Sequence, residues 1–79
     1  MKNYAEILIN DFRDEFVVNP DYRFSARKYL LATLMNLWSV SDDFDTDLDQ
    51  IRLIALDAGL RPSEIEKTIR HFDIKSAAL

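Results

Sequence analysis

Apolar residues recur along four stretches of the chain at the three- and four-residue spacing of one face of an α-helix. The pattern predicts helices over residues 1–17, 25–40, 46–58 and 62–72, followed by a frayed tail over 73–79. Because the chain has one Gly and two Pro, tight turns are few and a fold of many short strands is not expected. We therefore expect an all-α, compact four-helix domain that spans residues 1–79.

The ends of these stretches carry residues that commonly begin or end helices. Pro20 disfavours helical geometry in the residue before it, so the first helix is expected to end ahead of it. Ser25 and Thr46 are expected N-caps, because a hydroxyl oxygen can accept hydrogen bonds from the free N–H groups of a first turn. Gly59 suits a left-handed C-cap and Pro62 a first helical position, so the last two helices should form a hairpin.

The apolar faces differ between the first two helices. In the first, a stripe is expected from residues that recur every four positions: Tyr4, Leu8, Phe12 and Phe16. In the second, Leu31 and Met35 extend the apolar residues beyond one face. This indicates either a central core helix or a helix with a second face for a partner. We expect Trp38 in the core, which should form around Phe12, Leu34, Ile54 and Ile69.

The composition is that of a folded protein. A hydrophobic content of 48% and an aromatic content of 11% are too high for a disordered segment. The absence of Cys excludes a disulfide framework, a Cys-based zinc site and a thiol nucleophile, and it suits the cytoplasm, where we expect the protein. No segment approaches the roughly 20 apolar residues of a membrane span, and the N-terminal residues lack the apolar run of a signal peptide.

The net charge argues against nucleic-acid binding, and the residue types argue against catalysis. The formal net charge of −4 weighs against a duplex nucleic-acid ligand, whose binders usually carry a basic excess. His71 is the single histidine, and we expect it beside the C-terminal dipole of its helix. No nucleophile, general base and orienting group can be assembled from the sequence. We therefore expect no enzymatic activity, no cofactor and no metal site.

Five carboxylates fall within residues 42–49: Asp42, Asp43, Asp45, Asp47 and Asp49. A calcium-binding EF-hand loop starting at Asp43 needs Gly at its sixth position and Glu at its twelfth, where this chain has Leu48 and Ile54. Two interpretations stay open. The acids form either a solvated loop that favours the next helix, or an acidic knob that docks on a basic partner. For the second interpretation, the candidate partner-binding residues are Asp42, Asp43, Asp45, Leu31 and Met35.

Ala55, Gly59 and Ile65 stand at a spacing that brings two helices into close contact around a glycine turn. In this respect residues 50–70 resemble helix-turn-helix regulators. The resemblance implies that the last helix would read DNA, and its candidate contacts are Ser63, Lys67 and Arg70. A separate basic and aromatic cluster at the start of the second helix adds three candidates: Arg23, Arg27 and Lys28.

Two carboxylates count against this DNA-binding interpretation. Glu64 and Glu66 lie near the start of the would-be recognition helix, where they are expected to repel phosphates. A helical hairpin with another use therefore stays the alternative.

Residues 54–70, with their run Ala-Gly-Leu followed by Glu-Ile-Glu and Thr-Ile-Arg, also resemble the helical segment that closes the C-terminal domain of plasmid and phage primases. No polymerase acidic triad and no nucleotide-binding loop precedes the segment. The resemblance therefore implies an accessory helical module from a phage or other mobile element, not a primase.

Two hypotheses for the function follow. The first is a small non-enzymatic protein-interaction or regulatory module that binds another protein or itself. The alternative is a helix-turn-helix DNA-binding regulator.

Overall fold

Four α-helices make up the part of the chain that the computed structural model describes, residues 3–18, 21 and 23–77. They are α1 Tyr4–Glu15, α2 Arg23–Val40, α3 Phe44–Asp57 and α4 Pro62–Ala77. No strand occurs among the described residues. The predicted all-α four-helix domain is confirmed.

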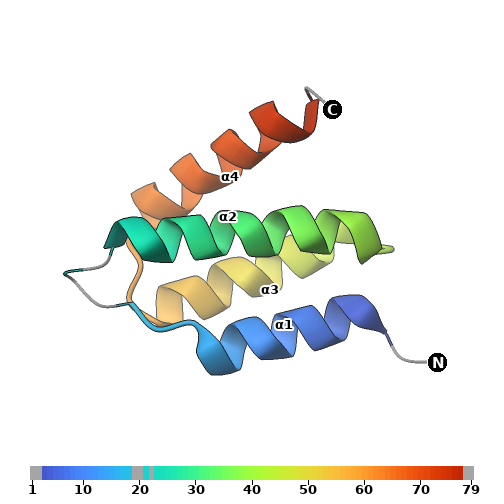
Figure 1. The fold of residues 1–79 in the computed structure, drawn as a ribbon, viewed down its shortest axis with the longest axis horizontal. Coiled ribbons are helices and arrows are strands. Elements are labelled where there is room, and N and C mark those ends of the chain that lie inside the picture. Colours follow the sequence, from blue (N-terminus) through green and yellow to red (C-terminus); the bar gives the residue numbers. More distant parts are fainter. Residues whose placement is uncertain (1–2, 19–20, 22, 78–79) are drawn as a thin grey trace.

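The helices are arranged around α2. It contacts each of the other three, α1 also packs on α3, and α3 also packs on α4, whereas the backbones of α1 and α4 do not approach each other closely. Figure 1 shows α1 and α3 on one side of α2 and α4 on the other, with α4 diverging from α2 toward its C-terminal end. The second helix is therefore the central helix of the bundle, which is one of the two interpretations of its broad apolar surface.

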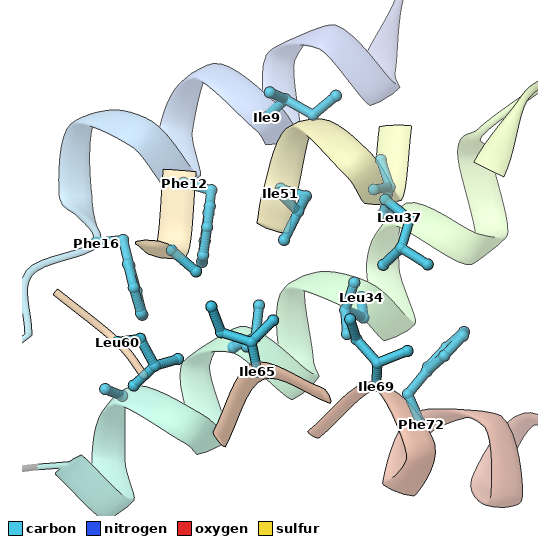
Figure 2. Close-up of a cluster of buried hydrophobic side chains, with 14 of the residues drawn as sticks. Ile9, Phe12, Phe16, Leu34, Leu37, Ile51, Leu60, Ile65, Ile69 and Phe72 are labelled. Atoms are coloured by element: carbon cyan, nitrogen blue, oxygen red, sulfur yellow. The ribbon is translucent and has the colours of Figure 1, made fainter. Parts of the chain in front are cut away.

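One hydrophobic core lies between the helices, and Figure 2 shows side chains from all four meeting there. Phe12, Leu34 and Ile69 are buried in it as expected, but Ile54 is only partly buried and packs against its edge. The buried line of α3 consists of Leu48, Ile51 and Ala55. Ile54 stands one residue, about 100° around the helix, from that line.

Helix α1 begins and ends inside its predicted bounds. Asn3 is the N-cap, and its side-chain oxygen accepts hydrogen bonds from the backbone N–H groups of Ala5 at 3.0 Å and Glu6 at 3.3 Å. The prediction that the helix reaches residue 17 was wrong, because Phe16 is extended, with φ −76° and ψ 112°. Two β-branched valines follow it, and such residues are poor helix formers. The predicted start at residue 1 lies outside the described residues.

The predicted apolar stripe of α1 is also corrected. Tyr4 is 66% exposed, and the buried residues of the helix are Ala5, Ile9 and Phe12. A strict four-residue repeat drifts about 40° around the helix at each step, because an α-helix has 3.6 residues per turn. The stripe therefore cannot stay on one side for three turns.

Two predicted N-caps were wrong. Ser25 lies inside the first turn of α2, which already begins at Arg23. Helix α3 is capped by Asp43 and not by Thr46, whose backbone N–H and hydroxyl both donate hydrogen bonds to the Asp43 carboxylate, at 3.4 and 2.7 Å. An Asp is as good an N-cap as a Thr, and the earlier start places Phe44 in the helix.

The hairpin between α3 and α4 has the predicted helix-turn-helix-like form. Gly59 has a φ of 107°, a region that glycine adopts without steric strain. The Gly59 N–H donates to the Leu56 carbonyl and the Leu60 N–H to the Ala55 carbonyl, both at 3.0 Å, as in a Schellman C-cap. Ala55 is fully buried and Ile65 is 2% exposed, so the two helices meet closely.

Helix α4 extends to Ala77, so the prediction of a frayed tail from residue 73 was wrong over residues 73–77. Residues 78 and 79 lie outside the described residues. Phe72 is 1% exposed and anchors the helix late in its length, and neither Gly nor Pro follows to end it. His71 therefore lies within the helix, not in its last turn. Among the described residues, no helix has both the length and the apolar character that crossing a membrane requires.

Candidate functional site

An aromatic cluster forms where the end of α2 meets the start of α3 and the second half of α4. The Trp38 ring lies edge-on to Phe44, with centroids 5.1 Å apart and planes at 89°, and its centroid is 6.1 Å from that of Phe72. Phe44 and Phe72 are themselves 5.3 Å apart. Phe72 is buried and Phe44 partly buried, but Trp38 is 53% exposed. The expectation that Trp38 belongs to the core was wrong.

The polar edge of the Trp38 ring is also open. None of the described residues accepts a hydrogen bond from the indole N–H. A tryptophan in this setting has a large apolar ring, held in place on one side by two phenylalanines, together with a donor that is available to another molecule.

The five aspartates beside this cluster have different roles. Asp43 is the N-cap of α3, Asp47 accepts a hydrogen bond from the Ser41 hydroxyl, and Asp49 forms an ion pair with Arg52 at 2.7 Å. Asp42 and Asp45 are exposed, and no side chain in the described part of the chain pairs with them. Of the three predicted partner-binding acids, Asp42 and Asp45 are therefore open to solvent, whereas Asp43 has a structural role.

The two apolar residues predicted to bind a partner do not form an open surface. Leu31 and Met35 are partly buried and pack against the hydrophobic core. Contact with three helices still leaves one side of α2 in water, but the exposed residues there include Lys28, Ala32 and Asn36, and not Leu31 or Met35. Trp38 and Val40, at 53% and 40% exposure, are the exposed apolar residues at the end of α2, and neither was predicted to bind a partner. The signal in the sequence for the exposure of Trp38 was its position outside the buried face of α2.

Three of the predicted nucleic-acid-binding residues lie along one line of α4. Ser63, Lys67 and Arg70 are all exposed, and their spacing of four and three residues places them on one face of the helix. The opposite face carries the buried Ile65 and Phe72. This outer face of α4 therefore presents two cations and one hydroxyl.

The two glutamates of α4 lie to the sides of that face. The Arg52 Nε is 3.0 Å from Glu66 Oε1, and the same guanidinium contacts Asp49, so Glu66 is drawn toward α3. Burial lowers the pKa of Arg52, but its hydrogen bonds to Asp49 and Glu66 outweigh burial, and the pKa lies above its ordinary value. Glu64 is only partly exposed. The expected repulsion between these two acids and DNA is weaker than their number indicates.

The other three basic candidates lie near the start of α2. Lys28 is exposed and Arg27 is partly buried, and the side chain of Arg23 lies outside the described part of the structure. Figure 1 shows α2 and α4 starting at the same end of the molecule, so the first turns of the two helices that carry basic candidates lie toward that end.

Metal-binding geometry is not found in the described part of the chain, where no three His or acidic residues are grouped to hold an ion. Thr68 is buried, and its hydroxyl donates to the Glu64 carbonyl at 2.8 Å within α4.

Comparisons of the chain with protein-family models, with curated proteins and with solved structures find no significant match.

Proposed function

We propose that the protein is a non-enzymatic interaction module that binds a basic segment of another protein at its Trp38 corner. We use this name for the surface formed by Trp38, Asp42 and Asp45. The observation that carries the proposal is the half-exposed Trp38 ring near the end of α2, followed in the chain by the carboxylates of Asp42 and Asp45. Neither the ring N–H nor these two carboxylates have a partner among the described residues.

The corner suits a cationic partner for three physical reasons. Tryptophan is among the residues that contribute most to binding energy at protein interfaces. The face of an indole ring attracts Lys and Arg, and nearby carboxylates strengthen the attraction and speed association. Contact with Phe44 and Phe72 limits the motion of the ring, so little entropy is lost when a partner fixes it.

A regulatory role in the cytoplasm is part of the proposal. The chain contains no Cys, which suits a reducing compartment. An origin in a phage or other mobile element is supported by the resemblance of residues 54–70 to the closing segment of plasmid and phage primases.

The test compares four immobilised forms of the protein in a cell lysate: wild type, Trp38→Ala, Asp42→Asn/Asp45→Asn, and the control Asp11→Asn/Asp14→Asn. The control removes the same charge from exposed positions of α1. We expect at least one protein that wild type and the control retain and that both corner variants lose. Once purified, that protein should change the fluorescence of Trp38, the single tryptophan, and bind more weakly as salt rises. If all four forms retain the same proteins, the Trp38 corner is not the binding surface.

The second candidate function is DNA binding through the outer face of α4. It is favoured by the ion pair between Arg52 and Glu66, because this pair leaves Ser63, Lys67 and Arg70 without an acid on their own line. A gel shift with random duplex DNA at two salt concentrations tests it. Binding that weakens steeply with salt and is lost in Lys67→Ala/Arg70→Ala supports this function. Absence of binding at low salt rejects it.

A further inference from the structure

A shallow groove runs between α1 and α3, away from the Trp38 corner. Its volume is about 290 Å³, and its lining residues are Arg13, Phe16, Leu53, Ile54, Asp57 and Ala58. Four of these six are apolar, and Phe16 is a core residue whose ring closes the groove from within. The groove therefore has an apolar floor with one charged side chain from each helix.

The two charges of the groove have no charged partners among the residues that the structure describes. Arg13 comes from α1 and Asp57 from α3, and neither is within ion-pair distance of an opposite charge in the described part of the chain. The Arg13 guanidinium makes a long hydrogen bond, 3.4 Å, to the side-chain oxygen of Asn10. The groove thus presents a free cation on one wall and a free anion on the other.

An exposed leucine, Leu53, stands on the wall of the groove, and a second, Leu56, lies about one turn further along α3. Leu53 is 67% exposed and Leu56 is 44% exposed, and their three-residue spacing sets them side by side on α3. Both point away from the buried line of that helix. Leucines this exposed on neighbouring positions are typical of an interaction surface.

We infer that this surface of α1 and α3 binds a second copy of the same chain around a two-fold axis. A two-fold interface brings one patch against itself, so the patch must be complementary to itself. This patch meets that requirement, because it presents a cation on one wall of the groove, an anion on the other and an exposed leucine beside them. A partner of one charge sign would match only one wall of the groove.

In such a dimer the two grooves face each other across the two-fold axis, and the exposed Leu53 side chain on the wall of each groove packs on the partner subunit. Arg13 then faces Asp57 of the partner subunit, and the same pair forms again across the axis. The interface buries leucines that are otherwise in water and gives each unpaired charge an opposite one.

Sedimentation velocity over a wide range of protein concentrations tests the inference. We expect a monomer–dimer equilibrium that is weakened about tenfold or more by Leu53→Ser. The matched control is Ile74→Ser on α4, because Ile74 is exposed to a similar extent, 72%. A protein that stays monomeric up to about 1 mM, the limit of a weak complex, overturns the inference. Equal weakening by both variants does so as well.

Charge exchange identifies the two-fold pair directly. Arg13→Asp and Asp57→Arg should each weaken the dimer about tenfold, because each places like charges opposite one another. The double variant restores both pairs with reversed sign, so its dimer should be within about threefold of wild type. Single variants without effect, or a double variant no better than the single ones, reject the pairing. The inference is independent of the Trp38 corner, and Trp38→Ala should leave the dimer unchanged.

Discussion

The two ends of α2 carry aromatic clusters that are alike in construction and different in their outer ring. Near its start, Tyr29 stacks on Phe12 and Phe16 with centroids 5.7 and 5.9 Å away. Near its end, Trp38 meets Phe44 and Phe72 edge-on. Both phenylalanines of the first cluster are buried, Phe12 at 0% and Phe16 at 5% exposure, whereas in the second Phe72 is buried, at 1%, and Phe44 is partly buried. Each cluster also has one ring from α2 that is partly in water.

The polar groups of the two outer rings distinguish the clusters. The Tyr29 hydroxyl donates a hydrogen bond to Glu15 at 3.3 Å, and the ring is 37% exposed. Trp38 is more exposed, at 53%, and its N–H has no acceptor among the described residues. The comparison indicates that the Tyr29 cluster mainly joins α1 to α2, whereas the Trp38 cluster leaves a surface for another molecule.

The largest expected effects are those of the two fully buried phenylalanines. Phe12→Ala and Phe72→Ala should each lower the free energy of unfolding by about 3–5 kcal/mol, because each leaves a cavity in the core. Urea unfolding followed by circular dichroism measures both losses. If one of them costs less than about 1 kcal/mol, the two clusters do not support the fold in the same way.

Trp38→Ala should lower the free energy of unfolding by about 1–2 kcal/mol, because it removes two edge-on ring contacts but little fully buried surface. The same urea experiment gives the value. A loss as large as that of Phe72→Ala would mean that Trp38 is a core residue and would weaken its assignment to a binding surface.

The acids just before α3 and in its first turn provide a smaller effect of the same kind. Asp43→Ala should cost about 1 kcal/mol, because it removes the N-cap of α3. Asp42→Ala and Asp45→Ala, at exposed positions without partners, should each change stability by no more than about 0.5 kcal/mol. Thermal unfolding of the three variants side by side separates the capping acid from the other two.

The smallest effect concerns pH. Burial raises the pKa of the Tyr29 hydroxyl above its ordinary value of 10.0, and the Glu15 carboxylate raises it further. The folded state therefore holds this proton more tightly than the unfolded state does. The contribution of the protonated Tyr29 hydroxyl to the free energy of unfolding is complete below about pH 10. It is lost as pH rises through the raised pKa.

Tyr29→Phe should remove this part of the alkaline loss and leave stability near neutral pH almost unchanged. Urea midpoints of wild type and variant, measured from pH 8 to 11, test this expectation, with ordinary tyrosine titration near pH 10 as reference. Parallel curves for the two proteins would show that the Tyr29 environment does not affect the alkaline transition.

The sequence was sufficient for features that depend on local periodicity and on rare residues. Four helices followed from the apolar spacing, and the hairpin followed from Gly59, the single glycine, between the small Ala55 and the apolar Ile65. The positive φ that the turn requires is strained for other residues, so its position could be predicted.

Features that depend on competition between neighbours could not be predicted in the same way. Asp43 and Thr46 are both good N-caps, and the tertiary contact of Phe44 with Trp38 and Phe72 goes with the earlier one. The exposure of Trp38 depends on how α4 crosses α2, which no spacing along the chain specifies. The opposite charges of Arg13 and Asp57 came together only once α1 had packed on α3.

The central position of α2 has a consequence for hydrogen exchange of the backbone amides. Because the backbones of α1 and α4 do not pack closely on each other, either helix can detach from α2 while the other stays docked. Amides in the middle of α2, around the fully buried Leu34, are released only when the whole domain opens. The slowest-exchanging amides should therefore lie in α2 and report global stability. The amides of the outer helices should exchange through separate local openings that require less free energy.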